Sequence, residues 1–198
     1  MRVLLIGATG TIGKAITAAL RGRHEVIQAS RQKAQEQVDI ADPASLRSLF
    51  ESVGRVDAIV SAAGNAAWKP LADLTDEDFA FSLANKLMGQ VNVARYGFAH
   101  VNDGGSITLT SGVLAQDPMP GSGAVSLVNA GLEGFGRAAA LEAPRGIRVN
   151  VVSPGWVAET LKAMGQDPRN GVPAADVAQA YVRSVEGADR GQILSPHR

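Results

Sequence analysis

Three glycines near the start of the chain have the spacing of a phosphate-binding loop. Gly7, Gly10 and Gly13 follow an apolar run at residues 3–6 and open a segment with apolar residues at helical spacing. A strand, a glycine turn and a helix in this order bind the pyrophosphate of a dinucleotide, because the amides and positive dipole end of the helix face the anion. Gly7 would permit the tight turn, Gly10 the approach of the phosphates, and Gly13 close packing of the helix on the strand. The alternative is a glycine turn with only a structural role.

Contacts with the diphosphate are therefore expected from the whole loop: Gly7, Thr9, Gly10, Thr11, Ile12 and Gly13.

The end of the next predicted strand, residues 25–29, bears on which dinucleotide binds. An NAD site places Asp or Glu about 20 residues after the glycines to hold the ribose, whereas an NADP site offers arginine to the 2′-phosphate. Here Ser30 and Arg31 follow the strand and no acid is present. A hydroxyl and a guanidinium suit a phosphate, so NADP(H) is favoured over NAD(H). The alternative is that Arg31 is an ordinary solvated charge.

Composition excludes several other classes. Lysine plus arginine (19) equals aspartate plus glutamate (19), so nothing indicates a nucleic-acid or membrane-surface partner, and a small-molecule substrate is expected. The chain has no cysteine, which excludes disulfides, thiol nucleophiles and cysteine-ligated metals, and no metal-ligand spacing is seen. No apolar run could span a bilayer and no cleavable leader precedes the first strand, so a cytoplasmic location is expected.

Strand and helix patterns alternate along the chain, which predicts an α/β fold. We expect a single doubly wound Rossmann domain over residues 1–198, with a mostly parallel seven-stranded sheet and helices on both faces. After the first unit, strands are predicted at 25–29, 37–40, 56–61, 106–110, 147–152 and 192–194. Helices are predicted from residue 43, over 75–100 with a capping box at its start, over 124–143 and over 172–185.

Several further segments carry a resemblance to a known family. Residues 61–64 read Ser-Ala-Ala-Gly after the fourth predicted strand, residues 106–112 end in Ser-Gly, and residues 153–155 read Ser-Pro-Gly after the sixth. With the glycine loop and the last strand, these segments resemble the short-chain dehydrogenase/reductase family over nearly the whole chain. The resemblance implies further cofactor contacts: Asp39 and Ile40 at the adenine, Ala62, Ala63 and Gly64 after the fourth strand, and Pro154 and Gly155 beneath the nicotinamide.

The family's main acid is missing from this sequence. In the family, a tyrosine transfers the proton as hydride moves, and a lysine four residues later lowers the pKa of that tyrosine. Alignment on this resemblance places Val125 at the tyrosine position and Asn129 at the lysine position. Valine cannot transfer a proton, and asparagine cannot supply a positive charge. The only tyrosines, Tyr96 and Tyr181, lie on other predicted helices.

Two candidate catalytic residues remain by the same resemblance. Ser111 stands where the family has the serine that binds the substrate oxygen. Lys86 replaces the family's asparagine, with Asn85 about 100° further around the helix. In a cleft, Lys86 would act as a general acid with a depressed pKa or clamp an anionic substrate; otherwise it is a surface lysine. Trp156 either lines the pocket or fills core.

Two functions are consistent with this pattern. The first is an NADP(H)-dependent oxidoreductase acting on a small carbonyl, alcohol or activated alkene, with Ser111 holding the oxygen and Lys86 or water supplying the proton. The second is a non-catalytic NAD(P)-binding sensor or interaction module on the same scaffold. The resemblance also implies a homodimer or homotetramer formed through the helices predicted at 75–100 and 124–143.

Overall fold

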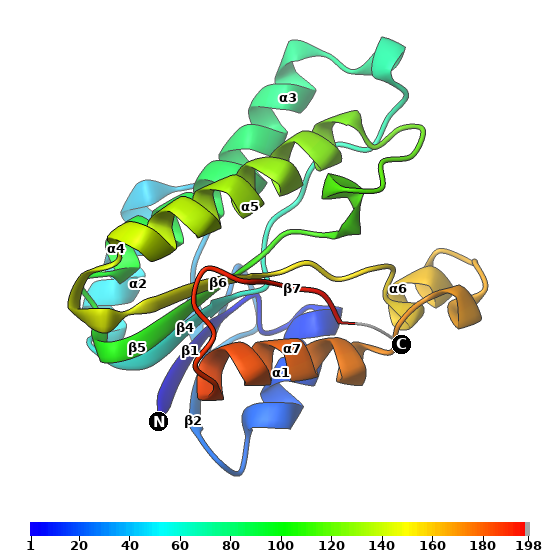
Figure 1. The fold of residues 1–198 in the computed structure, drawn as a ribbon. Helices are drawn as coiled ribbons and strands as arrows, with labels where there is room; N and C mark the ends of the chain where they lie inside the picture. The colour runs from blue at the N-terminus through cyan, green and yellow to red at the C-terminus, as the bar shows by residue number, and fades with distance from the viewer. Residues whose placement is uncertain (197–198) are drawn as a thin grey trace.

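A seven-stranded sheet forms the centre of the molecule, in the order β3-β2-β1-β4-β5-β6-β7 (Figure 1). The structure is a computed structural model and describes residues 1–196. Every pairing between neighbouring strands is parallel. The strands are β1 (Arg2–Ile6), β2 (Glu25–Ser30), β3 (Glu36–Gln37), β4 (Val56–Ser61), β5 (Val101–Thr110), β6 (Arg148–Val152) and β7 (Ile193–Leu194). This confirms the expected α/β fold, with a sheet that is parallel throughout.

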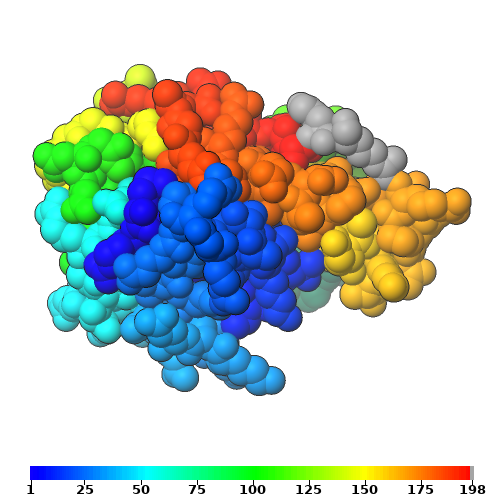
Figure 2. Space-filling model, turned by 90° about the horizontal axis from the view of Figure 1, so that it is seen from below, coloured from blue at the N-terminus to red at the C-terminus, as the bar shows by residue number. Residues whose placement is uncertain are grey.

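Helices cover both faces of the sheet. They are α1 (Thr11–Leu20), α2 (Pro43–Val53), α3 (Asp76–Ser82), α4 (Gly89–Gly97), α5 (Gly123–Glu142), α6 (Ala158–Ala163) and α7 (Ala174–Glu186). Figure 1 shows α2, α4 and α5 on one face and α1 and α7 on the other, with α1 and α7 side by side in Figure 2. No helix within residues 1–196 combines the length and apolar character needed to cross a lipid bilayer.

The first strand shows why its sequence is apolar at consecutive positions. Leu4 and Ile6 lie in the core under α2, α4 and α5, whereas Val3 and Leu5 lie in the core under α1 and α7. Successive strand residues point to opposite faces, and both faces are covered here, so each residue from 3 to 6 is buried. This burial fixes the position of the glycine loop that follows β1.

Some element boundaries differ from those expected. The third strand ends at Gln37 rather than residue 40, because Asp39 closes a turn by accepting the amide of Ala41 at 3.0 Å. The last helix begins at Ala174 rather than 172, because the Val172 amide donates to the Trp156 carbonyl at 2.7 Å.

The long helix predicted over 75–100 is interrupted. Its expected capping box is present, with the Thr75 side chain bonded to the Asp78 amide and the Asp78 side chain bonded to the Thr75 amide. A π-helical segment, Leu83–Met88, separates α3 from α4, and α4 ends at Gly97. π-helical turns are rare and often occur at functional sites, and this one carries Asn85 and Lys86.

Candidate functional site

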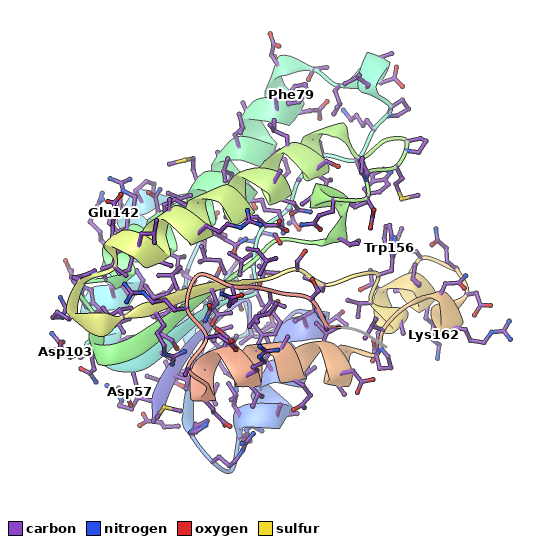
Figure 3. All side chains as sticks on the ribbon, viewed as in Figure 1. Asp57, Phe79, Asp103, Glu142, Trp156 and Lys162 are labelled. Atoms are coloured by element: carbon purple, nitrogen blue, oxygen red, sulfur yellow. The ribbon has the colours of Figure 1, made fainter. Side chains whose placement is uncertain are left out.

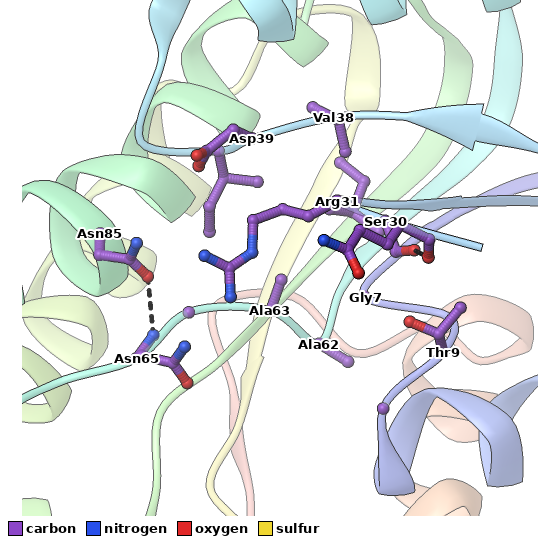
Figure 4. A pocket seen from close by; sticks show the side chains of 15 residues that line it. Gly7, Thr9, Ser30, Arg31, Val38, Asp39, Ala62, Ala63, Asn65 and Asn85 are labelled. Atoms are coloured by element: carbon purple, nitrogen blue, oxygen red, sulfur yellow. Dashed lines mark hydrogen bonds between the residues drawn. The ribbon is translucent and has the colours of Figure 1, made fainter. Parts of the chain in front are cut away.

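A pocket of about 570 Å³ opens at the carboxyl ends of β1, β2 and β4 (Figure 4). The order of the strands reverses direction between β1 and β4, and such a switch point is where open α/β sheets bind ligands. The lining includes residues expected from every nucleotide-contacting segment of the first half of the chain: Gly7, Thr9, Gly10, Ser30, Arg31, Asp39, Ile40, Ala62, Ala63 and Gly64.

Other lining residues were missed from the sequence: Ile6, Gln32, Val38, Asn65 and Asn85. Most are direct chain neighbours of expected residues, so extending each motif by one position would have found them.

The glycine loop is held by two close backbone contacts. Gly7 has φ +89°, and a Cβ there would lie 2.6 Å from the Ala62 carbonyl oxygen. A Cβ on Gly13 would lie 2.1 Å from the Gly7 carbonyl oxygen, so α1 packs directly on the loop. Gly10 differs, because a Cβ there would meet only the Gly7 oxygen, at 3.4 Å. The absence of a side chain at Gly10 therefore leaves space in the pocket and is not required for packing within the protein.

The first turn of α1 lacks a side-chain cap. Gly10 is its N-cap residue and offers no side chain to the first helical amides. Such amides need a partner, and an anion in the adjoining pocket would supply one. Thr11, Ile12 and Gly13 belong to this turn rather than to the pocket lining.

Arg31 extends across the pocket. Figure 4 shows its guanidinium between Asp39 and Asn65, above Ala63. Arg31 is exposed and has no ion-pair partner within residues 1–196. The Ser30 hydroxyl donates to the Gln32 carbonyl oxygen, so it would have to release this bond to donate to a phosphate. The free guanidinium is thus the stronger candidate for an anion.

The π-helical segment brings two polar residues to the loop after β4. The Asn85 side-chain oxygen accepts the Asn65 amide at 2.8 Å and ties that loop to the π-helical segment beside the pocket. Lys86 is half-buried, and a Cβ on Gly64 would lie 3.2 Å from its Cγ. Lys86 has no hydrogen-bond or ion-pair partner among the described residues, and burial lowers its pKa to about 8. This environment is unlike that of a freely solvated surface lysine.

Ser111 contacts a buried acid that the sequence reasoning missed. Its hydroxyl donates to Glu133 Oε1 at 3.0 Å, and both residues are buried. Glu133 follows Val125 and Asn129 at intervals of four residues on α5, so all three lie on one helix face. That four-residue spacing is the sequence signal from which Glu133 could have been found.

Asn129 provides a test of whether a nicotinamide nucleotide fits. Its Nδ2 lies 3.5 Å from the Gly112 oxygen, while its buried Oδ1 has no partner. A buried acceptor left without a donor is unusual, and a ribose hydroxyl would satisfy it. Pro154 and Gly155 follow β6 outside the pocket lining, and the Pro154 oxygen accepts the Val113 amide at 2.9 Å.

Neither of the two tyrosines lines the pocket. Tyr181 is fully buried on α7, its hydroxyl pairs with Thr110 Oγ1 at 2.8 Å, and burial raises its pKa. Tyr96 lies on α4 with the guanidinium groups of Arg47 and Arg95 over its ring. No group of three or more potential metal ligands among His, Cys, Asp and Glu occurs within residues 1–196.

An aromatic pair stands beyond β4 and β6. Trp68 and Trp156 meet edge to face with ring centroids 5.9 Å apart, and Figure 3 shows Trp156 where β6 leads towards α6. Trp156 is half-buried rather than enclosed in the core, and Trp68 is 45% exposed. The loop before α5 packs on the pair. Gly121 of this loop lies against the Trp68 ring, and the Gly121 carbonyl oxygen accepts the Lys69 amide.

Comparisons with known proteins agree with this fold. The family model described as enoyl-(acyl carrier protein) reductase matches residues 9–192. The protein lin1944 from Listeria innocua superposes with a TM-score of 0.96 at 41% identity, covering 100% of both chains. A small-chain dehydrogenase in complex with NADPH superposes with a TM-score of 0.87 at 28% identity, covering 98% of this chain and 95% of the other.

Curated relatives are similar over part of their length. Hydroxynaphthalene reductase arp2 of Aspergillus fumigatus is 35% identical over 67% of this chain, and the match spans only 51% of the relative. The hydroxynaphthalene reductase-like protein Arp2 of Metarhizium brunneum is 31% identical over 78% of this chain and 67% of the relative.

Proposed function

Because the chain belongs to the short-chain dehydrogenase/reductase family, we propose that it is an NADP(H)-dependent oxidoreductase of a small carbonyl, alcohol or activated alkene. The observation that carries the proposal is the pocket at the β1–β4 switch point, where an uncapped helix N-terminus and an unpaired Arg31 face one space. A diphosphate and a 2′-phosphate are the anions these two groups would hold. The NADPH complex of a related dehydrogenase supports the same choice.

The other end of the nucleotide would lie near the orphaned oxygen of Asn129. When bound, the nicotinamide supplies or accepts the hydride. Ser111 holds the substrate oxygen at the carboxyl end of β5, and Lys86 places a positive charge beside the loop after β4. A cation there favours the charge that develops on the oxygen.

The substrate class follows from the aromatic pair and the relatives. Trp68 and Trp156 offer ring faces and edges to a flat apolar molecule. Relatives in two fungi are named for the reduction of hydroxynaphthalenes. Bicyclic aromatic ketones are therefore the first substrates to test, before simple ketones and enones.

A second function has its own supporting observation. The resemblance places Val125 and Asn129 where the family has its tyrosine and lysine, and nucleotide binding without turnover is consistent with that alignment. The chain would then act as a sensor or interaction module.

One set of measurements separates these functions. Ligand at 100 times its Kd stabilises a binding protein by about 2.7 kcal/mol, so NADPH should raise the melting temperature. Loss of NADPH absorbance with the ketone panel, abolished in Lys86→Ala, supports the enzyme. Binding with no turnover supports the sensor, and no binding of any pyridine nucleotide contradicts both.

A further inference from the structure

Glu133 is a buried carboxylate that the proposed function does not use. Its residue exposure is 4%, and it projects from α5 towards the end of β5. Oε1 accepts the Ser111 hydroxyl at 3.0 Å, and Oε2 accepts the Gln116 side-chain amide. Buried acids of this kind are costly unless they are paired or have a chemical role.

The two oxygens of Glu133 face different environments. Oε1 faces Ser111, the residue expected to touch the substrate oxygen. Oε2 faces Gln116 and lies 3.8 Å from the Arg137 guanidinium, whose side chain is 59% exposed. The carboxyl group thus connects a buried serine at the edge of the sheet with the protein surface.

The Ser111 hydroxyl has one proton, and Glu133 accepts it. The remaining lone pairs of Ser111 Oγ are then available to an O–H group of a ligand. While its hydroxyl donates to Glu133, Ser111 can accept a proton from an alcohol and transfer its own hydroxyl proton to the carboxylate.

We propose that Glu133 stores the proton of the reaction and that Ser111 relays it to and from the substrate oxygen, in the place of the missing tyrosine. This inference rests on the proposed function. Ser111 is the group that touches the substrate, and Glu133 acts through it.

The proton and electron balance is complete. In reduction, the carbonyl carbon receives a hydride from NADPH, and the carbonyl oxygen takes the Ser111 hydroxyl proton. Ser111 takes the proton of the neutral Glu133 carboxyl, and the resulting carboxylate is reprotonated from water on the Arg137 side. In oxidation each transfer reverses, with NADP⁺ accepting the hydride.

Charged and polar groups from several elements surround Glu133. Arg137, on the same helix, is its ion-pair partner within the described residues. The loop before α5 contributes the uncharged Gln116, followed by Asp117, and Ser111 directly follows β5. The π-helical segment packs on α5 through Leu87 and Gly131 and carries Lys86, which has no ion pair with Glu133.

The first experiment measures pH–rate profiles of NADPH-dependent reduction with the ketone panel. Reduction consumes the proton held by the Glu133 carboxyl, so its rate should fall as pH rises. Glu133→Gln should lose this pH dependence and lower kcat by about 10²–10⁴-fold, with the Kd for NADPH changed less than about twofold. Glu133→Asp should restore the pH dependence, and Glu142→Gln, an exposed acid on the same helix, should match wild type.

The second experiment does not need turnover. Carbon-13 at the glutamate side-chain carboxyl reports the environment of Glu133, identified by the signal missing in Glu133→Gln. At constant pH, Ser111→Ala should shift this signal, because the carboxylate loses a hydrogen-bond donor. Exchanging NADPH for NADP⁺ should also shift it, because the oxidised ring is positively charged.

The outcomes distinguish the two proposals. Turnover by Glu133→Gln with an unchanged pH profile overturns the relay but does not contradict the proposed oxidoreductase activity. A carbon-13 signal of Glu133 that responds neither to Ser111→Ala nor to the charge of the nicotinamide ring has the same consequence. Loss of an inflection near pH 8 in Lys86→Met alone would assign the proton to Lys86 instead. Failure to bind any pyridine nucleotide overturns both proposals.

Discussion

Lys86 is a half-buried cation without a carboxylate partner in the described part of the chain. Its stem packs on Gly64, which follows β4, and burial lowers its pKa to about 8. A desolvated ammonium of this kind costs stability in the folded state. The same property underlies our proposal that Lys86 stabilises an oxygen that becomes negative.

The pH dependence of stability gives a test of this environment. In the unfolded chain Lys86 keeps its proton up to about pH 10.5, whereas the folded protein releases it at about 8. The folded state therefore binds fewer protons in this window, and the Lys86 contribution to stability improves as pH rises. Lys86→Met should melt at a higher temperature than wild type at pH 7, and the difference should shrink towards pH 10. A difference independent of pH would contradict the burial of the ammonium.

The unpaired guanidinium of Arg31 predicts coenzyme preference. A charge-assisted contact with the 2′-phosphate is worth about 1.5–3 kcal/mol, so Arg31→Ala should weaken NADPH binding by about tenfold or more. NADH, which lacks that phosphate, should be bound almost as before. Arg21→Ala is the matched control, because Arg21 is an exposed arginine outside the nucleotide pocket. Equal losses for NADPH and NADH, measured by calorimetry, would refute the role of Arg31.

At the scale of elements, the β1–α1 unit combines two kinds of glycine. Gly7 and Gly13 are required by the fold, because a Cβ at either would overlap backbone atoms. Gly10 has room for a methyl group within the protein. Any penalty of a side chain at Gly10 should therefore come from the ligand.

A pair of glycine substitutions tests this distinction. Gly10→Ala should keep its melting temperature within a few degrees of wild type and lose NADPH binding by at least about tenfold, because the methyl group occupies space needed by the phosphates. Gly134→Ala on α5 meets no atom within 4 Å and should be neutral or stabilising, since alanine favours the helix. Normal NADPH affinity in Gly10→Ala, measured by titration calorimetry, would place the diphosphate elsewhere.

At the scale of the whole molecule, α5 presents apolar side chains to solvent. Leu127 is 48% exposed and Leu141 is 84% exposed. On the neighbouring α3 and π-helical segment, Phe81 is 47% and Met88 is 41% exposed. Exposed apolar surface on adjoining helices is typical of a protein interface, so a homodimer or homotetramer formed through these helices stays our proposal.

Oligomeric state can be measured directly. We propose that wild type is a dimer or tetramer in light scattering coupled to size exclusion, and that Leu141→Glu shifts it towards the monomer. Burying a carboxylate without a partner in such an interface costs several kcal/mol. Met164→Glu is the control, because Met164 is a 57% exposed apolar residue near the end of α6. A monomeric wild type would contradict the proposed dimer or tetramer.

The sequence by itself determined what depends on local pattern. Covered strands require consecutive apolar residues, so β1 and β4 could be placed closely, and the glycine spacing located the loop that lines the pocket. The capping box at Thr75 and Asp78 also depends on residues three apart and was predictable.

Tertiary structure alone decided what depends on distant residues. Ser111 and Glu133 are 22 positions apart and meet only because α5 packs over the end of β5. Trp68 and Trp156 meet because the loops after β4 and β6 leave the same edge of the sheet. No sequence period encodes such contacts, since they follow from the packing of the layers.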